Sequence, residues 1–325
     1  MKILITGGAG FVGRHLALRL LAQGHTVWCV DALMPRTGGI DPQRGWPLAD
    51  PRDFSGFRFF PMDCRDWFRQ HGKEYFDQVH HLAALVGGRE VIENDPLSVA
   101  EDLAIDAMFW RWARTAQPGW IGCYSSSAAY PVRLQTQSAY RLLRESDIDW
   151  EADLGRPDLT YGWAKLTCEY LARIAYEKHG LASCIFRPFS GYGEDQDSAY
   201  PFPSILRRAI AERQARTLQV WGSGRQMRDF IHIEDCVSLI LLAAQSIRDA
   251  RPLNLSTGIL TSFVELAQRA GKFLGANFEV RGSSDKPEGV FARGGDTALQ
   301  QQLGFAPSIA FAEGIERGLK YFGAL

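Results

Sequence analysis

The chain has 325 residues and a net charge of −1, and this length suits one large domain with a smaller lobe. Its 36 basic and 37 acidic residues offer no net attraction for nucleic acid or a membrane surface, and no apolar run approaches membrane-spanning length. The six cysteines show no C-x-x-C spacing, which favours buried free thiols over disulfides or a metal site. Because the first strand begins at residue 2, we expect no signal peptide and a cytoplasmic protein.

The N-terminal residues have the pattern of a dinucleotide-binding unit. Residues 2–6 are a short apolar strand, and glycines follow at Gly7, Gly10 and Gly13. Glycines let the backbone turn tightly and approach a pyrophosphate, and the N-terminal amides of a helix predicted over residues 11–23 would point at that anion. A glycine triplet by itself can also be a simple tight turn, but the order of strand, glycines and helix favours a dinucleotide site.

A second apolar strand, predicted over residues 26–30, ends in Asp31. An acid about 20 residues past the glycines usually binds the adenosine ribose hydroxyls, and it would repel a 2′-phosphate, so we expect NAD rather than NADP. Arg36 lies close by in the sequence and could reverse this preference. It belongs to a Pro- and Gly-rich stretch, residues 33–56, which is either a lid or binding loop or a disordered excursion.

Segments typical of strands and helices alternate along the next part of the chain. In order, they are a strand at 57–61, a strand at 78–82, a long helix at 96–117, a strand at 120–124, a helix that contains Tyr161 and ends near Gly180, and a strand at 181–186. This alternation predicts an α/β fold with a doubly wound parallel (Rossmann) sheet. An insertion of mixed polarity, residues 132–156, could shape the mouth of a substrate site.

Tyr161 and Lys165 lie four residues apart, so they project from the same face of a helix. A phenol has an unperturbed pKa of about 10, and a nearby ammonium favours the phenolate and brings it into the range for proton transfer. The preceding strand delivers Ser125, Ser126 and Ser127 to the carboxyl edge of the sheet, where ligands of parallel sheets bind. A serine hydroxyl there can hold the reacting oxygen, which suits hydride chemistry at a carbinol carbon.

Over nearly its full length the chain resembles the extended short-chain dehydrogenase/reductase family, the NAD-dependent nucleotide-sugar epimerases and dehydratases. Besides the motifs above, the resemblance rests on His81-Leu-Ala-Ala84, Arg187-Pro-Phe-Ser-Gly-Tyr-Gly193, Gly222-Ser-Gly-Arg-Gln-Met-Arg-Asp-Phe-Ile-His232 and Leu303-Gly-Phe-Ala-Pro307. Residues 83–88 and 125–131 are most similar to the GDP-mannose 3,5-epimerases and GDP-fucose synthases. The resemblance implies an enzyme that uses NAD, acts on a nucleotide sugar and forms a homodimer.

The resemblance also implies roles for individual residues. Ser126, four residues before Tyr130, would act with Tyr161 and Lys165 in catalysis. The cofactor would contact Gly7, Gly10, Phe11, Val12, Gly13, Asp31, Asp63, Cys64, Leu82, Ala83, Ala84, Tyr161 and Lys165. The nucleotide sugar would contact Val86, Gly87, Gly88, Ser127, Ser190, Tyr200, Arg228 and Arg293. Asp63 would accept a hydrogen bond from adenine, and Arg228 would bind the diphosphate. The alternative for Asp63 is a turn aspartate, and the alternative for each arginine is a surface ion pair. The three serines could instead only cap the end of a strand.

For domain organisation, the resemblance implies a Rossmann domain over residues 1–187 and a smaller C-terminal substrate-binding lobe built mainly from residues 188–325. The composition supports this boundary, because shorter elements, more arginine and more proline follow Arg187. Residues 216–250 are expected to return to the first domain, with 217–220 and 230–247 joining its main sheet.

Several positions depart from the family pattern where a carbon-bound proton would be removed. Ala128 stands where the GDP-mannose 3,5-epimerases and GDP-fucose synthases have a cysteine. Tyr200 or Pro201 stands where they have a lysine or histidine. The 4,6-dehydratases carry an acidic residue directly after the catalytic serine or threonine, and here Ser127 follows instead. The residues that would exchange a carbon-bound proton are therefore missing, and only the hydride chemistry remains.

Two further departures are Ser190 and Asp102, which stand where the family commonly has asparagine. The main hypothesis is an NAD-dependent oxidoreductase or epimerase that transfers hydride at hexose C4 of a GDP- or other nucleoside diphosphate sugar, as a 4-epimerase or a 4-dehydrogenase. The first alternative is an NADPH-dependent reductase of a nucleotide-4-keto sugar. The second is a cofactor-binding regulatory protein without turnover.

Overall fold

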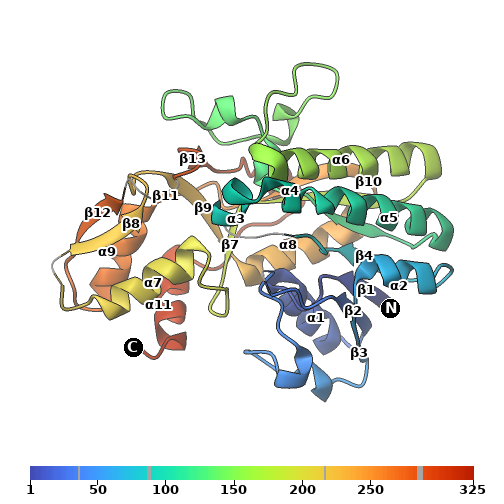
Figure 1. Ribbon diagram of the computed structural model, residues 1–325, viewed down its shortest axis with the longest axis horizontal. Coiled ribbons are helices and arrows are strands. Elements are labelled where there is room, and N and C mark those ends of the chain that lie inside the picture. Colours follow the sequence, from blue (N-terminus) through green and yellow to red (C-terminus); the bar gives the residue numbers. More distant parts are fainter. Residues whose placement is uncertain (36, 86–88, 216, 284–287) are drawn as a thin grey trace.

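The computed structural model describes residues 1–35, 37–85, 89–215, 217–283 and 288–325. A sheet of seven parallel strands lies at the centre of the larger part, with helices on both faces (Figure 1). In spatial order the strands are β10 (Asp249–Leu255), β6 (Ser183–Pro188), β5 (Ile121–Tyr124), β4 (Gln78–His81), β1 (Lys2–Thr6), β2 (Thr26–Asp31) and β3 (Phe57–Pro61). The doubly wound α/β fold predicted from the sequence is confirmed.

Strand β1 shows how this sheet is covered. Ile3 and Ile5 point to one face and Leu4 to the other, because successive side chains of a strand alternate. The first face is covered by α1 (Phe11–Ala22) and α8 (Ile233–Ser246), and the second by α2 (Cys64–Gln70), α5 (Glu101–Ala116) and α6 (Leu159–His179). A strand buried on both faces needs an unbroken apolar run, which Ile3, Leu4 and Ile5 provide.

The carboxyl ends of the parallel strands meet at one edge of the sheet. There β1 leads into the glycine turn, β2 ends in Asp31, and β5 leads into Ser125 and Ser126. Each of these features came from a separate segment of the sequence, and the parallel sheet brings them to the same edge.

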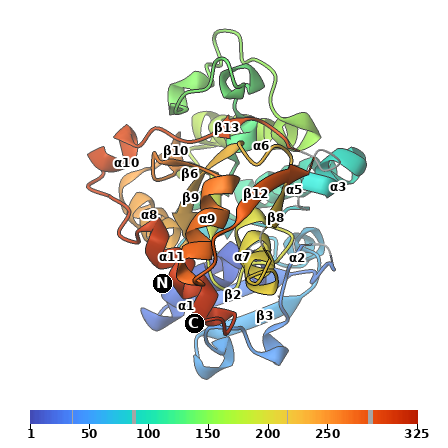
Figure 2. The same cartoon turned by 90° about the vertical axis from the view of Figure 1, so that its left-hand side faces the viewer.

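The smaller lobe lies beyond that edge and contains its own apolar core (Figure 2). Its elements are β7 (Ser190–Tyr192), α7 (Pro201–Ala211), β8 (Thr217–Trp221), β9 (Met227–His232), β11 (Leu260–Ser262), α9 (Phe263–Phe273), β12 (Glu279–Ser283), β13 (Ala292–Arg293) and α11 (Phe311–Tyr321). Strand β9 pairs with β7, β11 and β13. The remaining helices are α3 (Arg89–Asn94), α4 (Pro96–Val99) and α10 (Ala298–Gln302).

Two expectations about the elements were wrong. Neither β8 nor the β9 residues 230–232 join the main sheet. Strand β8 pairs with β12 in the lobe, because Leu218 and Val220 are buried against the lobe's helices, and β9 pairs with β7, β11 and β13. The returning segment is α8 with β10, which forms the edge of the large sheet. The long helix expected at 96–117 is divided into α4 and α5, because the backbone at Ala100 closes its turn on Leu97 with a three-residue spacing.

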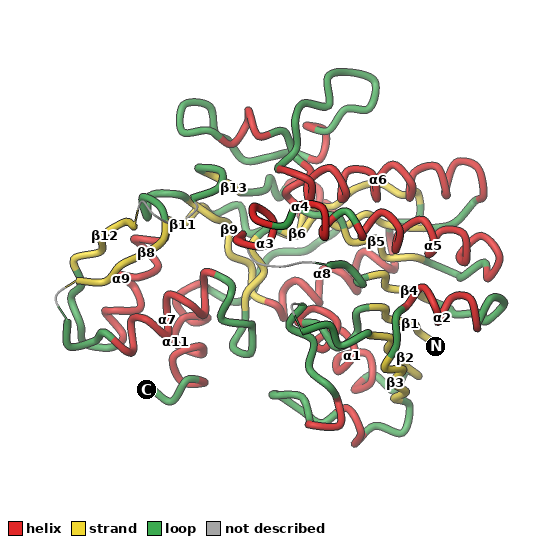
Figure 3. The backbone as a smooth tube through the Cα atoms, in the orientation of Figure 1, coloured by secondary structure: helices red, strands yellow, loops and turns green. Residues whose placement is uncertain are grey.

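The two long irregular stretches contain short turns (Figure 3). In the first, 3-10 turns form at Pro42–Arg44 and Pro51–Asp53, and the buried Trp46 packs edge-on against Phe57. The second, residues 132–156, projects from the main body and returns through Leu143, which bridges to Gly295 next to β13. The first stretch therefore packs on the domain through Trp46, and the second lies against the segment that supplies Arg293.

All six cysteines are buried, as the sequence predicted. The thiols of Cys123 on β5 and Cys168 on α6 lie 3.0 Å apart. Among the helices of the described residues, none combines the length and the apolar character that crossing a bilayer would require.

Candidate active site

A cavity of about 700 Å³ lies between the carboxyl edge of the large sheet and the smaller lobe. Every described residue that the sequence assigned to catalysis, to the cofactor or to the substrate lines this one cavity. Val86, Gly87 and Gly88 lie outside the described residues. Co-location in one cavity is what a shared site requires, and the role of each residue stays a prediction.

The glycine turn forms one end of the cavity and fits a dinucleotide. Gly7 has a φ of +71°, and a Cβ there would lie 2.8 Å from the Ala83 nitrogen. A Cβ on Gly13 would collide with the carbonyl oxygen of Gly7. Gly10 is the N-cap of α1, so the free amides of the first helical turn face the cavity at the position where a pyrophosphate would bind.

Asp31 lies next to this turn and holds it in place. Its carboxylate accepts hydrogen bonds from the backbone N–H of Ala9, at 3.0 Å, and of Leu33, at 2.8 Å. Burial raises the pKa of Asp31, and these two amides and the Arg14 charge oppose that effect. Each carboxylate oxygen keeps a second lone pair for a ribose hydroxyl. Arg36, the residue that could reverse the cofactor preference, lies outside the described residues.

We expect NAD to bind at least about 100-fold more tightly than NADP, because a 2′-phosphate would be placed against the Asp31 carboxylate and like-charge contacts cost several kcal/mol. Titration of the protein with each cofactor measures the ratio. Asp31→Asn should reduce the ratio of NAD to NADP affinity, and Asp41→Asn, a change at a half-buried turn carboxylate in the same loop region, should not. Tighter binding of NADP by the unmodified protein would contradict the prediction.

Asp63 and its neighbours form the adenine end of the predicted cofactor site. The Asp63 carboxylate caps α2 by accepting from the Arg65 N–H at 2.8 Å, and it forms an ion pair with the Arg65 guanidinium, also at 2.8 Å. Arg65 lowers the pKa of Asp63 through these hydrogen bonds. The residue thus has the structural role of a turn aspartate while lining the cavity, and its contact with adenine stays a prediction.

The predicted catalytic residues meet near the middle of the cavity. The Ser126 hydroxyl hydrogen-bonds the Tyr161 hydroxyl, and it also accepts from the Ala128 N–H at 3.1 Å. The Lys165 ammonium lies 5.7 Å from the centre of the Tyr161 ring. Ser125 donates instead to the buried carboxylate of Glu169, which makes it part of the core. The structure therefore favours Ser126 over its neighbour as the serine that holds the reacting oxygen.

The ionisation of Tyr161 is controlled by opposing effects. Burial raises its pKa above the ordinary value, and this is the largest effect. The Lys165 ammonium, the Ser126 hydrogen bond and, further away, a guanidinium act to lower it. Lys165 therefore lowers the pKa of Tyr161, as the sequence suggested. The desolvation of the phenol outweighs this effect, and desolvation cannot be predicted from residue spacing.

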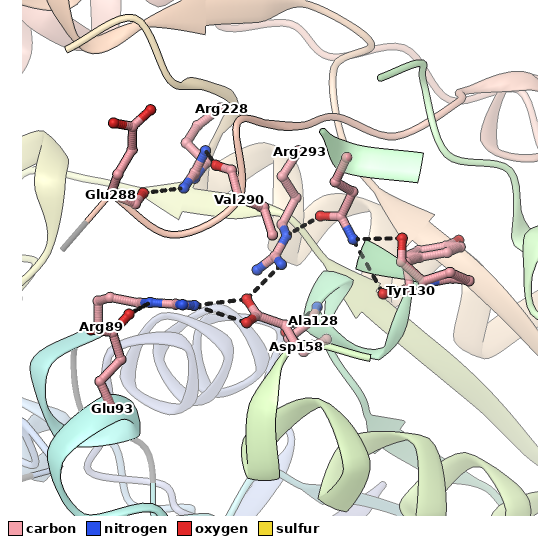
Figure 4. Close-up of polar contacts among 12 residues, drawn as sticks. Arg89, Glu93, Ala128, Tyr130, Asp158, Arg228, Glu288, Val290 and Arg293 are labelled. Carbon is pink, nitrogen blue, oxygen red and sulfur yellow. Dashed lines mark hydrogen bonds and ion pairs between the residues drawn. The ribbon is translucent and has the colours of Figure 1, made fainter. Parts of the chain in front are cut away.

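A cluster of three arginines and one aspartate lines the side of the cavity that faces the smaller lobe (Figure 4). Arg89, at the start of α3, donates to both oxygens of Asp158, at 3.0 and 2.8 Å. Arg293, on β13, donates to the same carboxylate at 2.7 Å and to the side chain of Gln135 at 2.7 Å. Burial raises the pKa of Asp158, but the two guanidinium groups outweigh it and hold the pKa below its ordinary value.

Arg228 completes the cluster and differs from the other two arginines. The hydrogen bonds it makes within the described part of the chain go to backbone carbonyl oxygens, at 2.7 Å for Met227, 3.0 Å for Val290 and 3.5 Å for Glu288. Burial and the neighbouring Arg293 charge lower its pKa, and the Asp158 and Glu288 charges offset only part of this effect. A guanidinium with this environment is suited to bind a phosphate group that enters the cavity.

Sequence reasoning missed Arg89 and Asp158. Asp158 lies three residues before Tyr161, at the N-cap of α6, and an acid at a helix start is usually read as a capping residue. Its side chain makes no capping hydrogen bond and faces the arginines instead. Arg89 follows directly after residues 83–88, which resemble the sugar-binding stretch of the family. This position is the only signal in the sequence that could have identified Arg89 as a site residue.

Ala128 and Tyr200, which stand where related enzymes have residues that exchange a carbon-bound proton, also line the cavity. Ala128 is buried beside the serines and has no titratable atom. Tyr200 caps α7 and lines the cavity, but burial and the neighbouring Tyr161 raise its pKa to about 12. A phenol with so high a pKa is a poor base near neutral pH.

Comparison with known proteins places these features in a family. Residues 3–256 match the NAD dependent epimerase/dehydratase family. The chain is 28% identical to GDP-mannose 3,5-epimerase of Arabidopsis thaliana, over 99% of this chain and 81% of the plant protein. It is 24% identical to UDP-glucose 4-epimerase of Mycolicibacterium smegmatis, over 99% and 98% of the two chains. It is 26% identical to dTDP-glucose 4,6-dehydratase of Streptomyces niveus, over 99% and 93%.

Solved structures with the same fold include two enzymes of this kind. UDP-glucose 4-epimerase of Thermotoga maritima, solved with UDP-glucose, superimposes with a TM-score of 0.79 at 22% identity over 99% of each chain. The dTDP-glucose 4,6-dehydratase DesIV of Streptomyces venezuelae, solved with NAD and TYD, gives 0.82 at 22% identity, over 99% and 97%. The family's dependence on NAD agrees with the cofactor predicted from the glycine turn. Since the family match spans most of the chain, this protein belongs to the NAD dependent epimerase/dehydratase family.

Proposed function

We propose that this protein oxidises the C4 carbinol of a nucleoside diphosphate hexose, and that it either releases the 4-keto sugar or reduces it to the 4-epimer. The observation that carries the proposal is the Ser126–Tyr161–Lys165 group in the middle of one cavity, between the glycine turn and Arg228. NAD, when bound, takes up the hydride from the carbinol carbon. In this proposal the sugar lies at Tyr161 and the diphosphate lies at Arg228, which line the same cavity.

The chain's own residues would handle the proton. The Ser126 hydroxyl donates a hydrogen bond to the C4 oxygen and Tyr161, as the phenolate, removes the hydroxyl proton. Lys165 favours that phenolate through its charge and holds the ribose that neighbours it. When the keto group is reduced again, the phenol returns the same proton. No other titratable group is needed for the reaction at this carbon.

Return of the hydride within one binding event is supported by how the cofactor end is closed. Arg14 donates to the carbonyl oxygens of Ala9, at 2.9 Å, and Gly38, at 3.3 Å, and forms an ion pair with Asp195 at 2.9 Å. These bonds join the glycine turn, the 33–56 loop and the segment after β7 around the cavity. An enclosed cofactor favours internal recycling over a reductase that exchanges NADPH at each turnover.

The experiment that tests the proposal combines two measurements on the purified protein. Mass spectrometry identifies nucleotide sugars that co-purify, and incubation with nucleoside diphosphate hexoses is followed by NMR for a 4-keto sugar or a 4-epimer. Absorbance in the reduced-nicotinamide band distinguishes a retained cofactor from an empty site, which would favour the reductase. Absence of any C4 reaction with every hexose tested would favour the regulatory protein, against which the complete catalytic set argues.

Oxidation at C4 leaves the neighbouring C–H bonds untouched, so we expect no solvent deuterium at C3 or C5 of the product after turnover in D₂O. The reason is that Ala128 and Pro201 cannot exchange a proton and the pKa of Tyr200 is about 12. NMR of the recovered sugar nucleotide reads the label directly, with a control without enzyme for exchange of the keto form. Deuterium at either carbon would mean that an acid–base pair exists, with Tyr200 or Asp158 the first residues to replace.

The homodimer stays a prediction. Large apolar side chains are exposed on three neighbouring helices: Leu97 on α4, Leu103 on α5, and Trp163 and Tyr170 on α6. Leu97 is 81% exposed and Trp163 is 50% exposed, which is unusual for such residues on packed helices. We propose that a second copy of the chain covers this face, as the family resemblance implies.

A further inference from the structure

A buried carboxylate, that of Asp102, lies directly behind the catalytic lysine. Asp102 is on α5, and its Oδ2 is 3.5 Å from the Nζ of Lys165 on the adjacent helix α6. Its other oxygen, Oδ1, accepts from the backbone N–H of Leu85 at 2.6 Å. The Asp102 side chain is only 1% exposed. One carboxylate thus contacts both the catalytic lysine and the segment that follows β4 along the cavity.

This charge is a departure of this chain, since the family commonly has asparagine at the position. An asparagine could also accept from the Leu85 N–H, but it carries no charge to set against the ammonium. Burial raises the pKa of Asp102, yet its contacts with an ammonium and an amide favour the ionised form. Burial alone would lower the pKa of Lys165, but the surrounding groups, with the Asp102 carboxylate the strongest of them, raise it.

Besides Asp102, three other titratable groups act on the charge of Lys165. On α6 they are Tyr161 and Cys168, and on α5 a second buried acid, Asp106, lies one turn beyond Asp102. Asp106 pairs with the His81 ring at 3.2 Å. The hydroxyl of Tyr161 is in turn influenced by Lys165, Asp102, Ser126 and Arg293, and it lies near Tyr200.

We propose that Asp102 is a positioning residue that holds the Lys165 ammonium and, by placing a negative charge behind it, sets the pH range in which Tyr161 can accept a proton. This proposal rests on the proposed catalytic role of Tyr161 and Lys165.

The direction of the effect follows from charge. The phenolate of Tyr161 is needed to accept the hydroxyl proton, so the competent fraction rises as the pH increases through the Tyr161 pKa. A carboxylate nearby disfavours a second anion, and it offsets part of the Lys165 charge, so Asp102 raises the pKa of Tyr161. Replacing Asp102 by a neutral residue should therefore move the phenolate to lower pH, by about one pH unit for a unit charge at this range.

The test measures Tyr161 directly and needs no substrate. The protein, carrying its bound cofactor, is labelled with ¹³C at tyrosine Cζ, and Tyr161→Phe identifies the Tyr161 signal among the 10 tyrosines. We expect the Tyr161 signal to titrate about one pH unit lower in Asp102→Asn than in the unmodified protein. Asp106→Asn is the matched control, because it removes a buried acid from the same helix but from the His81 side, and its shift should be less than half as large.

Two outcomes would overturn the proposal. The first is a Tyr161 titration in Asp102→Asn that is unchanged, or that moves to higher pH. The second is loss of folding in Asp102→Asn and also in the smaller neutral variant Asp102→Ser, which would assign Asp102 to stability instead. If no sugar nucleotide proves to be a substrate, the titration still stands, so failure of the proposed function and failure of this inference are distinguishable. Where turnover is found, the acidic limb of its pH profile should move with the titration.

Discussion

Replacing Tyr161 by phenylalanine is expected to reduce turnover by about 10²–10⁴-fold, the typical contribution of a positioned acid–base group. The ring would remain between Ser126 and Lys165, so binding of NAD should be nearly unchanged. Turnover falls because phenylalanine lacks the hydroxyl that carries the transferred proton in Tyr161. Steady-state kinetics on a nucleotide hexose, together with calorimetric titration of NAD, measures the two effects separately.

Two further variants make this result specific. Tyr176→Phe removes an exposed hydroxyl from the same helix, away from the cavity, and should leave turnover within about twofold of the unmodified protein. Lys165→Met should weaken both turnover and cofactor binding, because the ammonium acts on Tyr161 and on the nicotinamide ribose. Substantial activity in the Phe variant would show that another residue is the base.

Replacing Arg228 by alanine is expected to raise the Michaelis constant for the nucleotide sugar by roughly 10- to 150-fold, with a much smaller effect on NAD. A charge-assisted hydrogen bond to phosphate contributes about 1.5–3 kcal/mol, which corresponds to this range. Arg228 is the member of the cluster that is not held by a carboxylate in the described part of the chain, since its bonds go to backbone carbonyl oxygens. Arg228→Ala should therefore weaken binding of the nucleotide sugar more than it lowers the stability of the fold.

Arg225→Ala provides the matched control for this variant, because Arg225 is an exposed arginine three residues earlier and should have little effect. Binding of NAD that weakens as much as binding of the sugar nucleotide would place Arg228 in the cofactor site. Comparison with Arg293→Ala then separates the two arginines. Because Arg293 bonds to Asp158 and Gln135, Arg293→Ala should also lower the thermal stability. An arginine that only binds the phosphate of the substrate would not show this loss of stability.

The sequence alone determined the features whose physical cause is local. The glycine turn follows from the need for residues without Cβ where the turn approaches Ala83, and the apolar run of β1 follows from burial on both faces. Tyr161 and Lys165 share a helix face because of the helical repeat. These patterns also carried the family resemblance, which the match over residues 3–256 confirms.

Tertiary structure decided what depends on residues far apart in the chain. The family pattern favoured Ser126 among three adjacent serines, but only the tertiary structure shows the physical difference, since Ser125 donates to Glu169 while Ser126 acts on Tyr161. Strand β10, rather than β8, completes the sheet, because the choice depends on which apolar faces meet across long connections.

The charges at the site show the same division. Arg89, Asp158 and Arg293 form one cluster although 69 and 135 positions separate the bonded pairs. Residue spacing gave the direction of the lysine's effect on Tyr161, but burial decides the sign of its net pKa shift. A pKa depends on desolvation and on charges from every packed element, and those are set only once the helices and the two lobes are brought together.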